Sequence, residues 1–289
     1  LKKDLVTGIQ NKSFEYVNLP YLRDIILKKK YYDYLKNFHF KKGDIILTYN
    51  DSFLSDIALK LKNKFNLPWI SIVADLKSPN KSSGYVYLNW EYYKKDRISH
   101  KKICIDGGIK SSSTNLDLLK KNKIILYAGT IGGHAGVPYL IKAFNHITED
   151  KVELWLCGKG NYQDIKSLVN QNKRIKFKGY VTKRQLEKLC NQADIFINPR
   201  QADGNDTNFP SKILFYLSFK KPIISTKSGL GPKYKDVIFL LSNEKIKTLT
   251  SKINQVLSLN KKQKKIVKKK IINFTNENSW DEQTKKFFI

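Results

Sequence analysis

The sequence predicts an α/β protein built on doubly wound parallel sheets. Short apolar runs, typical of strands that are buried on both faces, recur along the 289-residue chain. Between them lie segments whose apolar residues return every three or four positions, as they do on a helix that packs against a sheet. The chain is long enough for two domains, each with its own core.

The region 1–110 is predicted to form a first, partial domain. After an irregular start, short apolar runs with strand character follow at 45–49, 69–73, 85–88 and 102–105. The segment 53–65 places four apolar residues on one helical face, namely Leu54, Ile57, Ala58 and Leu61. A strand, a helix and a strand within about 30 residues form a βαβ unit, which implies parallel strands.

Residues 111–123, rich in serine and then in lysine, are the predicted linker to a second domain at 124–275. Strands are expected there at 124–128, 153–157, 175–178, 195–198, 222–225 and 237–241. Helices are expected at 137–147, 162–170, 183–191 and 210–219. The regular alternation predicts a doubly wound domain, and a C-terminal helix is expected at 276–289.

The formal charge of +29, from 54 basic and 25 acidic residues, admits two interpretations. The lysines are spread along the chain, which favours a lysine-heavy composition that anionic membrane lipid would attract. Binding to nucleic acid is the alternative. The lysine run at 261–265 is interpreted as a solvated helix face, with contact with phosphate head groups as its alternative.

Several features bear on location. No apolar run approaches the roughly 20 residues that a membrane-spanning helix needs. The cysteines (Cys104, Cys157 and Cys190) are odd in number and far apart, which favours a reducing, cytoplasmic setting over a disulfide framework or a metal site. The basic charge would allow a peripheral position on the inner membrane face. The chain has no signal-peptide core and no methionine, so we expect a fragment.

Glycine and basic residues follow the predicted strands of the second domain. Because parallel α/β sheets bind ligands at the carboxyl ends of their strands, these residues predict a site for a phosphate-bearing ligand. The candidates after the first, second and fourth strands are Gly129, Thr130, Gly132, Gly133, Gly158, Lys159 and Arg200. Their spacing matches neither the P-loop nor the dinucleotide fingerprint.

The stretch Phe209-Pro210-Ser211-Lys212 predicts the start of a helix that binds an anion. Pro210 suits a first helical position, because its missing N–H is no loss there and its φ is already helical. The backbone donors just inside the helix, together with Lys212, would face the anion.

Four segments resemble the donor-binding half of a GT-B glycosyltransferase of the family 4 type (glycosyl transferases group 1). They are ILYAGTIGGHAGVPYLIKAF, VELWLCGKGN, IKFKGYVTKRQLEKLCNQADIFINP and NFPSKILFYLSFKKPIIST, and the match extends over about 124–241. The resemblance implies two Rossmann-like domains facing a cleft, with the last helix crossing back to the first domain. GDIILTYN, WISIVADL and WEYYKKDR resemble part of the acceptor domain, without its usual first strand and glycine-rich turn.

The resemblance also implies roles for residues. Phe209 to Lys212 would face the diphosphate of a nucleotide sugar, Gly129 to Gly133 would cover the donor, and Gly158 and Lys159 would lie near the nucleotide. No cofactor or metal is expected. The catalytic candidates are Asp75, His134 and Asp206. Thr207 and Phe215 stand where the family usually has two glutamates eight positions apart.

The predicted function is therefore the transfer of a hexosyl unit from a nucleotide diphosphate sugar to a glycan or lipid-linked acceptor. The resemblance implies retention of anomeric configuration, and surface polysaccharide synthesis is the expected context. One alternative is a catalytically inactive GT-B-like subunit that binds a partner or a glycan. The other is a basic nucleic-acid-binding protein.

Overall fold

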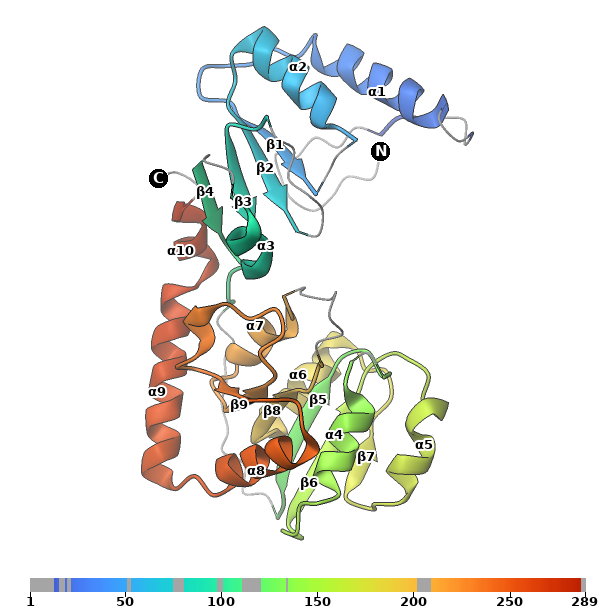
Figure 1. The fold of residues 1–289 in the computed structure, drawn as a ribbon, viewed down its shortest axis with the longest axis vertical. Helices are drawn as coiled ribbons and strands as arrows, with labels where there is room; N and C mark the ends of the chain where they lie inside the picture. Colours follow the sequence, from blue (N-terminus) through green and yellow to red (C-terminus); the bar gives the residue numbers. More distant parts are fainter. Residues whose placement is uncertain are drawn as a thin grey trace. The chain divides into compact units, whose positions relative to one another are not determined.

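The computed structural model describes residues 13–15, 19, 22–50, 53–74, 81–97, 101–110, 121–133, 135–201 and 209–286. The chain forms two compact units. Unit 1 consists of Leu1–Leu88 and Asp96–Cys104, and unit 2 of Asn89–Lys95 and Ile105–Ile289. Each unit contains one parallel sheet, of four and six strands respectively, which confirms the predicted α/β class (Figure 1). The predicted linker at 111–123 lies mostly outside the described residues.

Unit 1 is built on a sheet with the strand order β1-β2-β3-β4. The strands are β1 (Ile46–Tyr49), β2 (Trp69–Val73), β3 (Gly84–Tyr87) and β4 (Lys101–Cys104). Helix α2 (Ser55–Phe65) connects β1 to β2 and buries Ile57, Ala58 and Leu61. The Trp69 indole N–H donates to the Thr48 hydroxyl at 3.0 Å inside this unit. The predicted βαβ unit is thus present.

Helix α1 (Leu22–Leu35) lies where the sequence predicts no regular element, so that prediction was wrong. None of its side chains is buried. A helix that buries no side chain needs no apolar stripe, and the helical periodicity is accordingly weak in the sequence.

Unit 2 has the sheet order β10-β9-β8-β5-β6-β7. Its strands are β5 (Lys123–Ala128), β6 (Val152–Cys157), β7 (Ile175–Phe177), β8 (Ile195–Asn198), β9 (Ile223–Ser225) and β10 (Phe239–Leu240). From β5 the chain adds β6 and β7 on one side and then β8 to β10 on the other. The order therefore reverses between β5 and β8, which is where doubly wound proteins bind ligands.

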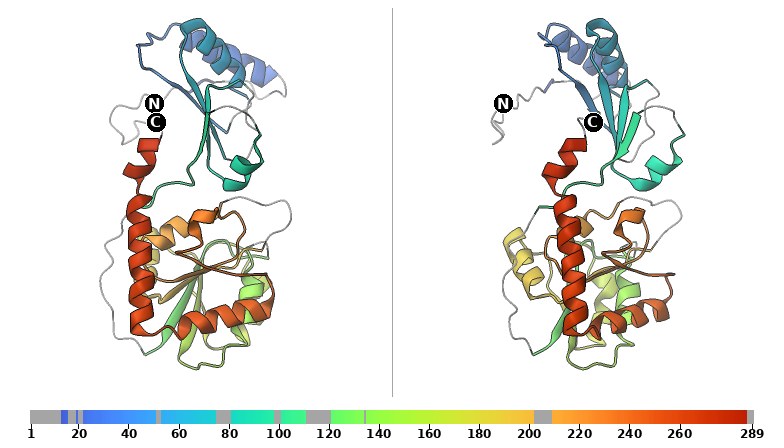
Figure 2. Two further views of the ribbon diagram at one scale, coloured as in Figure 1. Left: turned by 60° about the vertical axis from the view of Figure 1, so that its left-hand side comes forward. Right: turned by 90° about the vertical axis from the view of Figure 1, so that its left-hand side faces the viewer.

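Two apolar clusters fill the two faces of this sheet. Ile125 and Tyr127 of β5 belong to one cluster and Leu126 to the other, as expected for side chains that alternate along a strand. The first cluster contains residues of α4 (Val137–Phe144), α5 (Gln163–Asn170) and α8 (Ile246–Leu257). The second contains residues of α6 (Lys183–Gln192), α7 (Lys212–Leu217) and α9 (Lys261–Glu277). Figure 2 shows the sheet between these helices.

Shorter elements complete unit 2. They are α3 (Trp90–Lys95), a 3₁₀ turn at Pro232–Tyr234 and α10 (Trp280–Lys285). The region expected as one C-terminal helix thus holds the end of α9, a break at Asn278 and Ser279, and α10. In the part of the chain that the structure describes, no helix has both the length and the apolarity needed to cross a membrane.

Lys221, which precedes β9, forms hydrogen bonds with the end of helix α6. Its amine donates to the backbone oxygens of Cys190, Asn191 and Ala193 at 3.0, 2.6 and 2.6 Å. These carbonyls lie at the helix C-terminus, where they lack intrahelical partners and where the helix dipole favours a cation.

We expect Lys221→Met to lower the free energy of unfolding of unit 2 by about 2–3 kcal/mol, because it removes charged hydrogen bonds and leaves the carbonyls of the helix end unsatisfied. Urea unfolding followed by circular dichroism measures this change. Lys227→Met, at an exposed lysine of the same unit, is the control. Equal stabilities for the two variants would contradict this role of Lys221.

Candidate functional site

The loops after β5 and β6 lie in direct backbone contact. The Gly129 N–H donates to the Cys157 oxygen at 3.0 Å, and the Ile131 N–H donates to the Lys159 oxygen at 2.7 Å. A Cβ atom added to Gly158 would lie 1.7 Å from the Gly129 oxygen. Loop packing therefore requires a glycine at position 158, a role that the sequence interpretation, which placed Gly158 near the nucleotide, did not include.

The open part of the first loop is at Thr130 and Gly133. Both residues are exposed, and a Cβ atom at Gly133 would meet no atom within 4 Å. Gly132 between them is buried. Of the predicted glycines in this loop, Gly133 is thus the one whose surroundings leave room for a ligand.

Lys212 places a cation against the carboxyl end of β5. Its amine lies 3.3 Å from the Tyr127 hydroxyl and 4.5 Å from the centroid of the Tyr127 ring. A Cβ atom at Gly129 would stand 2.7 Å from the same nitrogen. Gly129 consequently provides the space that the lysine occupies.

Burial dominates the electrostatics of this group of residues. Burial is the larger cause and the positive charge of Arg200 the smaller cause that together lower the pKa of Lys212 to about 8. Burial also raises the pKa of Tyr127 well above its usual value, so this hydroxyl stays protonated and donates to the Thr130 oxygen at 2.7 Å. An anion bound here would be stabilised by two neighbouring cations that water screens poorly.

Helix α7 begins later than the sequence predicts. It has six residues and starts at Lys212, so Pro210 lies before the helix and is not its first residue. The Ile213 N–H donates to the Pro210 oxygen at 2.9 Å, and the Leu214 N–H donates to the Ser211 oxygen at 3.1 Å. Two of the backbone donors at this helix start are therefore already used by the chain, and the Lys212 side chain supplies a cation beside them.

The remaining residues of the FPSK stretch have different environments. Ser211 is exposed, and Pro210 is buried. The Phe209 ring packs against Tyr234 at a centroid distance of 5.7 Å. Phe209 and Pro210 thus hold the chain in place, and Ser211 is accessible.

The end of β8 brings Asn198, Pro199 and Arg200 beside the same loop. A Cβ atom at Gly136 would lie 2.1 Å from the Pro199 oxygen, so the two backbones touch. The Arg200 oxygen accepts a hydrogen bond from the Thr226 hydroxyl. Arg200 is half-buried, and its charge acts on Lys212.

Lys159 is separate from this group. It is exposed, and its amine lies 4.5 Å from the centroid of the Tyr180 ring, on the loop after β7. The structure therefore places it toward the β6–β7 side of the sheet, while Lys212 contacts residues of β5.

Sequence reasoning missed two tyrosines. Besides Tyr127, Tyr216 of α7 is fully buried, and its hydroxyl accepts from the Ala128 N–H at 2.8 Å and donates to the Ala128 oxygen at 3.0 Å. The β5–β8 ladder pairs Ile125 and Leu126 of β5, and Tyr216 bonds the N–H and the oxygen of Ala128 beyond the end of that ladder. A tyrosine at a core position of a predicted helix was the available signal.

Phe215 is part of an apolar contact. Its ring meets Phe219 edge-on at a centroid distance of 5.1 Å, and it packs against the second core cluster. A side chain in this environment cannot hydrogen-bond a donor ribose as a glutamate would. Asp75, His134, Asp206 and Thr207 lie outside the described residues.

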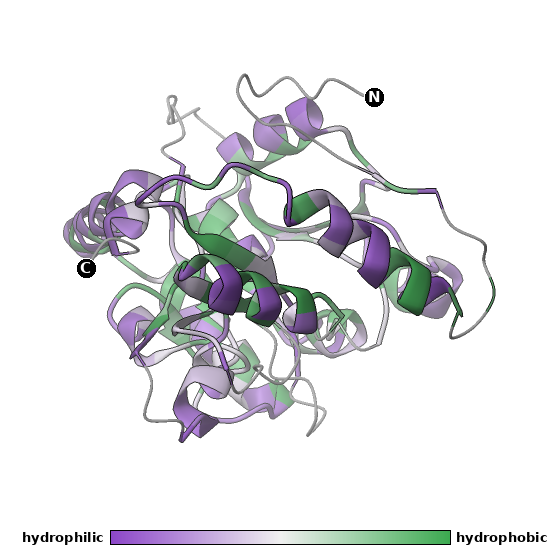
Figure 3. Cartoon of the chain, turned by 90° about the horizontal axis from the view of Figure 1, so that it is seen from above, coloured by the Kyte–Doolittle hydropathy of each residue, from purple (hydrophilic) through white to green (hydrophobic). Residues whose placement is uncertain are grey.

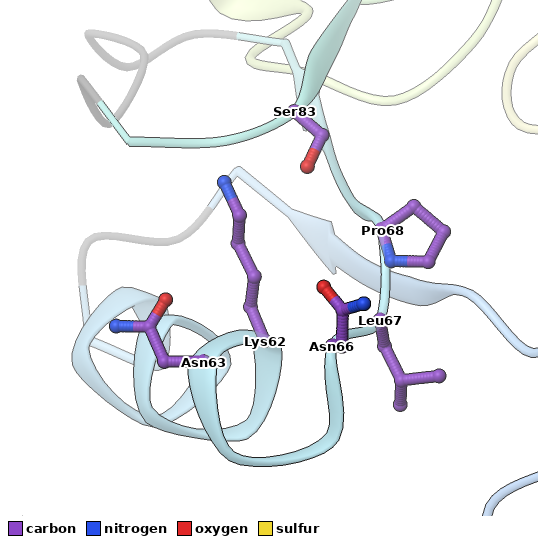
Figure 4. A pocket seen from close by; sticks show the side chains of 6 residues that line it. All are labelled: Lys62, Asn63, Asn66, Leu67, Pro68 and Ser83. Carbon is purple, nitrogen blue, oxygen red and sulfur yellow. The ribbon is translucent and has the colours of Figure 1, made fainter.

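Unit 1 also contains a pocket (Figure 4). It is lined by Lys62, Asn63, Asn66, Leu67, Pro68 and Ser83. It lies near the amino-terminal ends of β2 and β3, opposite to the edge where parallel sheets bind ligands. Lys62 donates to the Lys81 oxygen at 3.0 Å, so its amine is already engaged by the protein.

Comparison with known protein families gives a match over the middle part of the chain. Residues 122–259 match the family described as glycosyl transferases group 1. No curated protein sequence matches the chain. Many solved structures share its fold.

Three of these structures illustrate the likeness. A glycosyltransferase from Rickettsia africae has 16% identity and a TM-score of 0.72, over 96% of this chain and 83% of that chain. The lipopolysaccharide outer core galactosyltransferase WaaB has 17% identity and a TM-score of 0.71, over 94% and 80%. HepE of Anabaena, solved with UDP and glucose, has 14% identity and a TM-score of 0.67, over 91% and 80%. At these identities the likeness establishes the GT-B fold.

Proposed function

We propose that this chain, whose residues 122–259 form a glycosyl transferases group 1 domain, transfers a sugar from a nucleoside diphosphate sugar to a glycan or lipid-linked acceptor. The observation that carries the proposal is the half-buried Lys212 amine against the carboxyl end of β5, next to Arg200 and an open glycine loop. Two cations at the switch point of a doubly wound sheet suit a diphosphate.

The chemistry that these residues support is stabilisation of the leaving group. When the bond between the anomeric carbon and the diphosphate breaks, negative charge builds up on the departing oxygen. The Lys212 amine is already held against Tyr127 before the reaction, so it stabilises this charge with little reorganisation, and Arg200 adds positive charge nearby. In this proposal no protein group needs to protonate the diphosphate. We infer a hexosyl donor and retention of configuration from the family alone, with surface polysaccharide as the expected product.

The test is the release of nucleoside diphosphate from a panel of nucleotide sugars, with and without glycan acceptors. The wild type should release it at a measurable rate, and Lys212→Met should reduce the rate by at least about 100-fold. Lys151→Met, at an exposed lysine that precedes β6 at the opposite edge of the sheet, should leave the rate unchanged. A chain that neither binds nor cleaves any member of the panel would overturn the proposal.

Phe215 supports a second candidate, a GT-B-like subunit that binds a partner or glycan without turnover. Its ring occupies an apolar contact where the family resemblance expects a carboxylate. In the same assay, this candidate predicts nucleotide binding without diphosphate release. Phe215→Glu should then create no activity and should lower the free energy of unfolding by about 1–3 kcal/mol, because it places a carboxylate among apolar side chains. Release by the wild type would exclude this candidate.

A further inference from the structure

We propose that the exposed side of helix α9 docks the protein on the surface of an anionic lipid bilayer. Within ten consecutive residues this helix carries seven lysines, all of them exposed, which we call the lysine face. They are Lys261, Lys262, Lys264, Lys265, Lys268, Lys269 and Lys270. Figure 2 shows α9 as a long helix along the outside of unit 2.

The lysine face is held on a fixed support. Ile271, Phe274 and Thr275 of the same helix are buried, and the first two belong to the second core cluster of unit 2. The helix is therefore fixed in rotation. At 3.6 residues per turn, Lys261, Lys262, Lys265 and Lys269 share an arc of about 100° on the side away from these buried residues. Figure 3 shows this part of the chain, beside the C-terminus, mostly in the hydrophilic colour.

In the part of the chain that the structure describes, no acidic side chain pairs with the lysine face. Across the described ranges, none of its seven amines takes part in an ion pair or a hydrogen bond. The one acidic residue of the helix is Glu277, its last residue. The charge is thus available to a partner.

The clustered lysines also lower the stability of helix α9 itself. Lys261, Lys265 and Lys269 follow one another at intervals of four, where like charges repel. Four of the seven lysines lie in the first five residues of the helix, at the end where the helix dipole disfavours cations. The cap uses the neutral pair Asn260 and Gln263, so it does not offset this charge. A bound anionic surface would remove both penalties.

The chemistry of the face fits lipid better than nucleic acid. Its cations are all lysines, which bind phosphate as point charges, whereas readout of bases uses the arginine fork and single strands use aromatic stacking. Among the lysines, Ile266 is 49% exposed. An aliphatic side chain surrounded by lysines suits the boundary between head groups and acyl chains. The net charge of +29 adds long-range attraction.

The experiment is co-sedimentation of the full chain with vesicles of phosphatidylcholine alone or with about one third phosphatidylglycerol. The test variant changes Lys261, Lys262, Lys265 and Lys269 to glutamine. The control changes four exposed lysines of unit 2 outside α9 to glutamine, namely Lys151, Lys166, Lys173 and Lys188. Both variants lose the same charge, so only position differs.

We expect the wild type to bind the vesicles that contain phosphatidylglycerol and not those of phosphatidylcholine alone. It should dissociate when the salt concentration rises to about 0.5 M. The α9 variant should bind at least about 30-fold more weakly, since each lysine near an anionic surface contributes roughly fivefold. The control variant should change binding by less than about fivefold. Equal losses in the two variants would overturn the proposal. So would an α9 variant that loses affinity for duplex DNA while vesicle binding is unchanged. Nucleoside diphosphate binding by the α9 variant, measured in parallel, confirms that unit 2 is folded.

Discussion

Replacing Lys212 with methionine is expected to weaken nucleoside diphosphate binding by at least about 100-fold while leaving unit 2 no less stable at pH 7. The loss of affinity follows from the position of the amine, which is half-buried against Tyr127 and adds to the charge of Arg200. Methionine keeps most of the volume of the side chain and removes the cation. Calorimetric titration with UDP measures the change, and Lys151→Met, at the opposite edge of the sheet, is the control.

The stability of this variant separates a binding lysine from a structural one. Because the folded-state pKa of Lys212 is about 8 and the ordinary value is 10.5, the unfolded chain binds more protons between these two pH values. At pH 7 the buried charge therefore lowers the free energy of unfolding by its full amount, on the order of 1–3 kcal/mol. This destabilisation decreases as the pH rises from 8 to 10.5. The contact of the amine with the Tyr127 ring offsets part of it.

Urea unfolding at pH 7 and pH 10 tests this expectation. Relative to Lys212→Met, the wild type should gain stability as pH rises. A variant that is clearly less stable than the wild type at pH 7, with a difference that does not depend on pH, would show that Lys212 serves the fold. Affinity for UDP should fall in the wild type as the pH rises above about 8, the pKa of the amine in the free protein. A bound diphosphate raises this pKa, so binding above pH 8 requires the uptake of a proton.

Gly158→Ala is expected to destabilise unit 2 by more than about 3 kcal/mol or to prevent its folding. The added Cβ would lie 1.7 Å from the Gly129 oxygen, and the overlap is with backbone, which a rotamer change cannot relieve. The φ of +144° at Gly158 adds strain for any other residue. Gly133→Ala is the matched control, since a Cβ there meets no atom within 4 Å.

Thermal unfolding followed by circular dichroism compares the two glycine variants. The control should melt within about 2 °C of the wild type, which for a chain of this length corresponds to less than 1 kcal/mol. A Gly158→Ala protein that melts with the wild type would mean that the β5 and β6 loops are not in backbone contact.

The regular elements of unit 2 could be predicted because each buries a stripe or a face of apolar side chains. The strand β5 and the helix α4 lie within three residues of their predicted ends. Helix α1 could not be predicted in this way, because it buries none of its side chains. The start of α7 was misplaced because Pro210 suits a turn before a helix as well as a first helical position.

The sequence allowed us to predict which chain segments contribute to the candidate site. It did not allow us to predict which residues of these segments contact one another. Glycines and cations after strands indicated the carboxyl edge of the sheet as the candidate site, and the structure brings Gly129 and Lys212 together at this edge. The bonds between Tyr216 and Ala128 join residues 88 positions apart, and only the folded arrangement brings them together. Gly158 was attributed to ligand binding because a sequence does not show which backbone a missing Cβ would meet.

The most direct test of the central claim is a crystal structure of the chain soaked with UDP. We predict electron density for the diphosphate within hydrogen-bonding distance of the Lys212 amine, beside Arg200 and the loop at 129–133. A nucleotide that binds elsewhere on the molecule, or crystals that stay empty at saturating UDP and other nucleoside diphosphates, would contradict the assignment of this edge of the sheet as the donor site.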